Sequence, residues 1–265
     1  MTFLNSAVKT VLFASIATGA LALSSAAKAE DNSGLCDTLA ASNYDLNRPA
    51  GLAGVPLGQI DVAKALPACR DAQAKAPGDV RLAFQLGRVL MQDGKEAEAA
   101  VLFEQAAKTG YTAAMVNLGV VLEDKKPDEA FAWYEKAARM GHVIGEYNLG
   151  IAYRNAIGTP VDVTKALEWF QKSSDQGDAA AAYEIAVIHD EGKLVPENTV
   201  EALKYYRLAV DRGNLDAMVN LGYMYENGEG VPADTEAALA LYKRAVTLGD
   251  AEAQTDVTRL EAVVK

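Results

Sequence analysis

Histidine and cysteine are the residue types here that are best suited to metal binding or proton transfer, and the sequence holds two of each. His142 follows a glycine in a turn-forming stretch, and His189 stands where Tyr153 and Tyr225 stand in similar stretches of the chain. A histidine acts as a ligand or a general base only beside suitable partners, and no HExxH pattern supplies them. We interpret both histidines as variants of structural positions, and we predict no catalytic residue, no metal site and no cofactor.

The two cysteines, Cys36 and Cys69, are too far apart for a CxxC redox motif. In an exported protein an even pair of cysteines typically forms a disulfide, and one pairing is available within this chain. We predict a Cys36–Cys69 disulfide that ties an irregular N-terminal segment to the next helix. Closing a loop of this length would stabilise the folded state by about 4 kcal/mol on the chain-entropy account.

Motifs for other common chemistries are missing from the sequence. It contains no GxSxG, no phosphate-binding loop and no GxGxxG between a strand and a helix, and no SxxK pattern occurs after residue 29. The acidic stretch 225–229 lacks the alternating oxygen ligands of a calcium loop. These absences favour a binding protein over an enzyme.

Residues 1–29 have the features of a secretory leader. Lys9 precedes an apolar run at 11–23, and Ala27-Lys28-Ala29 offers a small-x-small cleavage site. A run of 13 residues is short for a membrane span, so an uncleaved anchor is the lesser alternative. We predict cleavage after Ala29, no membrane insertion afterwards, and export to a bacterial periplasm. A eukaryotic secretory lumen is the other compartment that fits.

The chain is acidic, with 25 Lys and Arg against 36 Asp and Glu and a net charge of −11. Removing a leader that holds two lysines and no acid leaves 23 basic residues against 36 acidic ones, a net charge of −13. Such a surface repels phosphate backbones and anionic membranes, so we predict no nucleic-acid partner. The acid excess also serves solubility, and it leaves basic partners open.

A repeated pattern dominates the rest of the chain, with a Leu-Gly pair or its variant recurring at spacings of 32, 31, 36 and 36 residues. Within each unit, apolar residues recur every three to four positions, which predicts two amphipathic helices. Repetition at this period is typical of a solenoid. The pairs are Leu86-Gly87, Leu118-Gly119, Leu149-Gly150, Ile185-Ala186 and Leu221-Gly222, and the glycines that close the units are Gly110, Gly141, Gly177, Gly213 and Gly249.

Three details refine this pattern. Asp234 is placed to cap the second helix of its unit, and the closing glycines supply left-handed residues. The glycine inside each first helix predicts close contact between the paired backbones. Aromatic residues recur as pairs in the second helices, which predicts core packing; these pairs are Trp133-Tyr134, Trp169-Phe170 and Tyr205-Tyr206.

The stretches 118–142, 149–178 and 221–250 resemble the Sel-1-like repeat, a relative of the tetratricopeptide repeat. The Leu-Gly pair, the connecting loop, the aromatic pair and the closing glycine match in order, although Ile185-Ala186 departs from the pattern and the first two units lack the long loop. The resemblance implies a right-handed α–α superhelix of about five two-helix repeats. We therefore predict an all-α solenoid with a polar C-terminal capping helix.

The predicted organisation has three parts. Residues 1–29 are the leader, residues 30–60 are irregular apart from a short helix near 35–42, and residues 61–265 form the solenoid, starting with a helix at 62–75 capped by Asp61. The predicted repeats are 79–110, 111–141, 142–177, 178–213 and 214–249, followed by a cap at 250–265.

The resemblance also implies where a partner binds, because first helices line the concave surface of tetratricopeptide-like stacks. Side chains there that the core does not need are candidates for contact, and tyrosines beside amides suit an extended segment. The candidate binding residues are Tyr147, Asn148, Arg154, Tyr183, Glu184, Asn220 and Tyr223.

Relatives of this kind are mostly scaffolds and adaptors for other proteins, so the resemblance implies a protein partner in the cell envelope. Two alternatives stay open. Some cysteine-rich relatives have been called beta-lactamases, but those carry a cysteine pair in each repeat, which this chain lacks. The other alternative is a structural protein associated with peptidoglycan.

Overall fold

The computed structural model describes residues 32–263 of the 265-residue chain. The predicted leader and its cleavage site after Ala29 lie outside these residues. Every regular element in the described part is helical. The elements are α1 (Asn32–Ala40), the 3-10 helix η1 (Leu57–Gln59), α2 (Val62–Lys75), α3 (Val80–Gln92), α4 (Glu96–Lys108), α5 (Thr112–Leu122), α6 (Pro127–Arg139), α7 (Val143–Asn155), α8 (Val163–Asp175), α9 (Ala179–Glu191), α10 (Thr199–Asp211), α11 (Leu215–Asn227), α12 (Thr235–Thr247) and α13 (Gln254–Val263).

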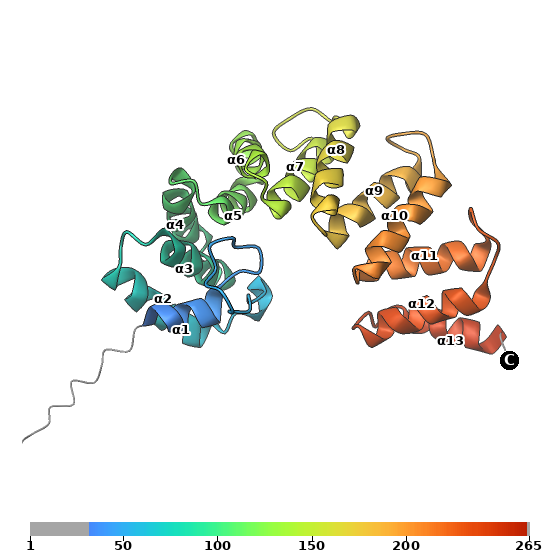
Figure 1. The fold of residues 1–265 in the computed structure, drawn as a ribbon, viewed down its shortest axis with the longest axis horizontal. Coiled ribbons are helices and arrows are strands. Elements are labelled where there is room, and N and C mark those ends of the chain that lie inside the picture. The colour runs from blue at the N-terminus through green and yellow to red at the C-terminus, as the bar shows by residue number, and fades with distance from the viewer. Residues whose placement is uncertain (1–31, 264–265) are drawn as a thin grey trace, which may run out of the picture. The chain divides into compact units, whose positions relative to one another are not determined.

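From α3 onward the helices pack in pairs that follow the predicted units. α3 packs on α4, α5 on α6, α7 on α8, α9 on α10 and α11 on α12, and each second helix also contacts the first helix of the next pair (Figure 1). The prediction of an all-α repeat solenoid is confirmed. None of the helices between residues 32 and 263 is long and apolar enough to cross a membrane.

Local capping signals set the ends of the helices. Asp61 and Asp234 accept hydrogen bonds from the backbone amides of Lys64 and Ala237, so both predicted caps are confirmed. Each of the five closing glycines has φ between 77° and 113°, a left-handed conformation that favours glycine.

In four of the five first helices, the glycine of the Leu-Gly pair lies against an aromatic ring, and not against a backbone as we predicted; the remaining first helix, α9, has Ala186 at this position. A Cβ atom on Gly119 would lie 2.3 Å from the Tyr134 ring, and one on Gly150 would lie 2.6 Å from the Phe170 ring. Gly87 and Gly222 face Phe103 and Tyr242 in the same way. The small residue therefore lets the ring of the second helix reach the surface of the first.

These rings form the centre of the core. Phe103, Tyr134, Phe170, Tyr206 and Tyr242 are at most 2% exposed. Core packing is thus confirmed for the second member of each aromatic pair and also for Tyr205, which belongs to the same core. The tryptophans that precede them are only partly buried, and Lys136 and Lys172 stack on the rings of Trp133 and Trp169.

Residues 32–60, which we call the N-terminal segment, pack on the start of the solenoid. Helix α1 spans Asn32–Ala40, so it begins and ends earlier than the predicted helix near 35–42. The predicted disulfide between Cys36 and Cys69 is present and joins α1 to α2. Beyond α1 the chain runs without regular structure to η1, apart from turns.

Helix α13 covers the last repeat. Val257 and Leu260 pack with Tyr242 of α12, and Arg259 on its other side pairs with Glu226 and Asp256. This helix buries few apolar residues and has a polar outer face, as a terminal helix of a solenoid needs.

Candidate functional site

The seven predicted binding residues lie on three consecutive first helices, α7, α9 and α11. We call the surface that they form the first-helix surface. It comprises Tyr147, Asn148 and Arg154 of α7, Tyr183 and Glu184 of α9, and Asn220 and Tyr223 of α11.

Three of these residues form a polar cluster that joins α7 to α9. The Tyr147 hydroxyl donates to a Glu184 carboxylate oxygen over 3.3 Å, and the Arg154 guanidinium forms an ion pair with the same carboxylate. Burial raises the pKa of Glu184, and Arg154 partly offsets this rise. The cluster fixes the spacing of two neighbouring repeats, so its side chains are already engaged within the chain.

A second polar cluster joins α9, α10 and α11. The Tyr183 ring packs 6.0 Å from the Tyr206 ring, and the Asn220 amide donates to the Tyr206 hydroxyl over 3.1 Å. The Tyr206 hydroxyl in turn donates to Asp190 over 2.9 Å. Asn220 therefore bridges two helices. We use "column" for the equivalent position in successive repeats; Asn220 belongs to the column directly before the Leu-Gly pair.

Tyr223 and Asn148 differ from the other five because they are available to a partner. Tyr223 is 54% exposed. Asn148 is partly buried, and its side-chain amide makes no hydrogen bond with any residue of the described part of the chain. An exposed ring and a free amide are the groups that an extended segment needs, one for apolar contact and the other for its backbone.

The corresponding surface of the first complete repeat is occupied by the chain's own N-terminal segment. Gln85 of α3, in the same column as Asn148, donates to Asp37 over 2.6 Å. Arg88, in the same column as Tyr223, donates to the carbonyl oxygens of Ala40 and Val55 over 2.5 and 2.6 Å. Burial lowers the pKa of Arg88 to about 10.

Sequence reasoning missed Gln85 and Arg88. A basic residue directly after the Leu-Gly pair, where the later repeats have Val120, Ile151, Val187 and Tyr223, is the signal that marks this repeat as different. The N-terminal segment is held further along by Asp45, whose carboxylate accepts a hydrogen bond from the Tyr111 hydroxyl over 2.7 Å.

An acidic cavity of about 390 Å³ continues the first-helix surface toward α13. Tyr183 and Asn220 line it together with Asp216, Asp250, Glu252 and Asp256. Asp250 caps the following turn by accepting from the amide of Glu252, and Asp256 pairs with Arg259. Four carboxylates against one neighbouring guanidinium leave this end of the surface negative.

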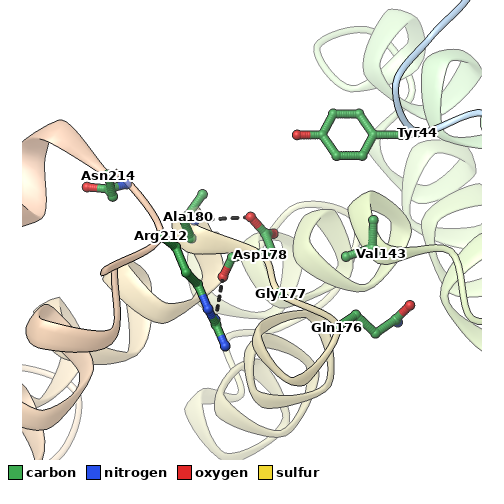
Figure 2. A pocket seen from close by; sticks show the side chains of 9 residues that line it. Tyr44, Val143, Gln176, Gly177, Asp178, Ala180, Arg212 and Asn214 are labelled. Atoms are coloured by element: carbon green, nitrogen blue, oxygen red, sulfur yellow. Dashed lines mark hydrogen bonds between the residues drawn. The ribbon is translucent and has the colours of Figure 1, made fainter. Parts of the chain in front are cut away.

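A larger cavity, of about 550 Å³, lies where the N-terminal turns of α7, α9 and α11 come together (Figure 2). Tyr44 of the N-terminal segment also lines this cavity, and its hydroxyl makes no hydrogen bond within residues 32–263. The polar groups of Arg212 and Asp178 are engaged within the chain. Arg212 donates to the Ser174 hydroxyl and to the carbonyl oxygen of Asp178, while the Asp178 carboxylate accepts from the Ala180 amide and the Ser173 hydroxyl. We interpret this cavity as a joint between repeats.

The two histidines are not brought together by the fold. His142 is 2% exposed and caps α7, with Nδ1 accepting from the Gly145 amide over 3.2 Å. His189 lies one repeat further along the chain, on α9. Within residues 32–263 no group of three His, Cys, Asp or Glu side chains is arranged to hold a metal ion.

Burial of His142 makes the stability depend on pH. Desolvation lowers the pKa of His142 from the ordinary value of 6.5. Just below pH 6.5 the unfolded chain is therefore protonated at His142 to a greater extent than the folded chain. The contribution of a neutral His142 to the free energy of unfolding is thus complete above pH 6.5 and is lost as the pH falls below it.

The matched variant is His142→Asn, because Asn214 caps the equivalent helix α11 and does not titrate. We expect the melting temperature of the wild type to fall more than that of the variant between about pH 7.5 and about pH 5.5. Differential scanning calorimetry at both values measures this, and equal falls would show that His142 does not titrate in this range.

Comparisons with known proteins agree with this geometry. The family described as Sel1 repeat matches residues 112–142, 143–178, 179–214 and 215–250, each match starting one residue after the predicted unit. The helix pair of α3 and α4 precedes these matches. A comparison with curated proteins gives no significant match.

Two solved structures are similar over about three quarters of this chain. A Sel1 repeat protein from Oxalobacter formigenes is 28% identical, with a TM-score of 0.62, and the alignment covers 74% of this chain and 82% of that one. The protein c5321, a protective antigen present in uropathogenic Escherichia coli strains and displaying an SLR fold, is 25% identical, with a TM-score of 0.59 over 75% of this chain. The alignment spans 44% of that antigen. The family matches cover more than half of the sequence, and the chain belongs to the Sel1 repeat family.

Proposed function

We propose that this protein is a non-enzymatic adaptor or scaffold of the bacterial cell envelope, and that its first-helix surface binds an extended segment of a partner protein. Sel1 repeats are in general scaffolds for protein interactions. The proposal assigns binding to Tyr223 and Asn148, with Tyr183 and Asn220 forming the wall that leads to the acidic cavity.

The observation that carries this proposal is the N-terminal segment on α3. There, Gln85 holds the Asp37 side chain of α1, and Arg88 holds two backbone carbonyl oxygens, that of Ala40 at the end of α1 and that of Val55 in the non-helical stretch that follows. Contacts to backbone atoms do not depend on a particular sequence, so the same columns of later repeats can take another chain in the same way. In α7 and α11 those columns present Asn148 and Tyr223 without an occupant among the described residues.

Charge favours a partner segment with basic side chains at the α13 end of the surface. Asp216 and Glu252 of the acidic cavity make no ion pair within residues 32–263, although both line the same space as Tyr183. Lysine or arginine side chains entering there would be attracted by the local field and by the net charge of the whole chain.

A periplasmic location follows from the predicted leader and is supported by the disulfide. Disulfides persist in oxidising compartments such as the periplasm and are rare in the cytosol. The Cys36–Cys69 bridge joins the N-terminal segment to α2, so the part of the chain that occupies the surface of α3 is tied down in such a compartment.

Capture of the partner, followed by a comparison of two exposed residues, tests the proposal. Tagged protein is crosslinked in cells, the retained proteins are identified by mass spectrometry, and the affinity of the main one is measured for Tyr223→Ala. The control is Val200→Ala, because Val200 is 72% exposed on the second helix α10.

We expect Tyr223→Ala to weaken binding about tenfold, as the loss of an aromatic contact residue does, and Val200→Ala to leave it unchanged. Equal affinities for the two variants would move the binding surface elsewhere. Retention of cell-wall fragments alone would replace the protein partner by peptidoglycan.

A further inference from the structure

A second groove lies beside the first-helix surface, between the N-terminal segment and helices α3, α5 and α7. We call it the N-terminal groove; its volume is about 480 Å³. Val116, Val120 and Ile144 come from the helices, and Val55, Pro56 and Leu57 come from the N-terminal segment. Asn148 lies in this groove as well as on the first-helix surface, so the two are continuous.

Large apolar side chains in this groove are open to solvent. Val120 of α5 is 50% exposed, Leu57 is 37% exposed, and Tyr44, which also lines the groove, is 52% exposed. Most other large exposed apolar residues of the described chain stand outside every cavity named above. Apolar surface gathered in one groove is typical of a binding site, whereas single exposed residues are ordinary.

The groove holds no free charge. Arg88 is its one charged lining residue, and both Nη atoms of Arg88 already donate to the carbonyl oxygens of Ala40 and Val55. A charged side chain entering the groove would lose water without gaining a counter-ion, which is costly. An uncharged occupant is therefore favoured here, in contrast to the acidic cavity at the other end of the surface.

One amide in the groove is free to bind a backbone. Four of the five residues in its column hold partners: Gln85 donates to Asp37, Asn117 to the Ala113 carbonyl of its own helix and Asn220 to Tyr206, while Glu184 pairs with Arg154. Asn148 is the member whose side chain has none among the described residues. Its amide offers two donors and an acceptor, which match the peptide groups of an extended chain.

We propose that the N-terminal groove binds an extended, uncharged segment of the partner protein, with an apolar side chain packed between Leu57, Val120 and Ile144 and a backbone peptide group hydrogen bonded to Asn148. The inference rests on the proposed function, since it places a second part of the same partner. It gives the bound segment a direction, with apolar residues at the α5 end and basic residues at the α13 end.

The test uses random peptides displayed on phage and selected on the purified protein. Selected peptides are then synthesised, and their affinities are measured for the wild type and for Val120→Asp, which places a charge in the groove. The matched control is Val101→Asp, because Val101 is 65% exposed on α4 and outside the groove. Circular dichroism confirms that both variants fold.

Selected peptides that bind in the N-terminal groove are expected to be uncharged and rich in apolar residues. Their affinity should fall about tenfold in Val120→Asp and by a similar factor in Asn148→Ala, and stay unchanged in Val101→Asp. Peptides that bind Val120→Asp as well as the wild type, or mostly charged peptides whose affinity falls in Val120→Asp, would overturn the inference.

Two further outcomes separate this inference from the proposed function. Peptides that lose affinity in Tyr223→Ala but not in Val120→Asp would refute the N-terminal groove and leave the first-helix surface intact. Peptides indifferent to all these variants would refute both. Light scattering tests for self-association that depends on concentration. If the protein self-associates, and Val120→Asp weakens this while Val101→Asp does not, the occupant of the groove is a second copy of this chain and the proposal of a partner segment is wrong.

Discussion

Replacing Phe170 by alanine is expected to lower the free energy of unfolding by about 3–5 kcal/mol. The Phe170 side chain is completely buried, and its ring packs against Gly150 of the paired helix and 5.8 Å from the Tyr147 ring. Truncation removes these contacts and leaves a cavity between α7 and α8 that two helices with fixed neighbours cannot close. Urea denaturation followed by circular dichroism measures the loss.

The contact between Phe170 and Gly150 gives this prediction a sharper form. In the wild type, Gly150→Ala should lower the free energy of unfolding by about 1–3 kcal/mol, because its Cβ would lie 2.6 Å from the ring. In the Phe170→Ala background the same change should raise it by about 1 kcal/mol, the helix propensity gained over glycine. If Gly150→Ala changed the free energy of unfolding in the same direction in both backgrounds, Gly150 would not be required for packing of the Phe170 ring.

Removal of the disulfide by the double substitution Cys36→Ala and Cys69→Ala is expected to cost about 4 kcal/mol of stability. The bridge closes a loop with a sequence separation of 33, and both cysteines are fully buried. The loss should concentrate in the N-terminal segment, where the Val55 amide bonds to the Ala41 carbonyl oxygen over 2.7 Å.

Hydrogen exchange locates this loss, and reduction of the wild type is its control. Amides of residues 41–60 should exchange faster in the double variant and in the reduced wild type, while amides of α9–α12 keep their protection. Uniform protection along the chain in the double variant would show that the remaining contacts, including those of Arg88 and Asp45, hold the segment without the bridge.

The fold could be predicted from the sequence because its signals are local. Both α7 and α8 begin at a capping side chain, His142 and Asp162, and each unit repeats an apolar pattern, so the pairing of these two helices needs no information from distant parts of the chain. The internal glycines show the limit of such reasoning. Gly150 signals a close approach, but only packing determines that the approaching group is the ring of Phe170.

The candidate site was harder to predict from the sequence because its contacts join different repeats. Tyr147 and Glu184 are 37 positions apart, and their hydrogen bond depends on the register of two helices. The contact of Arg88 with Ala40 spans 48 positions and begins in a stretch without repeats, where no periodic pattern exists to align. Columns of first-helix residues can thus be read from the sequence, but which members face a partner depends on what the rest of the chain already occupies.

Site-specific photo-crosslinking in living cells tests the central claim most directly, namely that the first-helix surface holds a partner segment. A photoreactive amino acid is placed at position 223 on α11 and, in a second strain, at position 200 on α10, both exposed in the wild type. The account predicts one protein crosslinked from position 223, none from position 200, and the crosslinked peptide rich in lysine or arginine. Crosslinks to the same protein from position 200, with none from position 223, would contradict it.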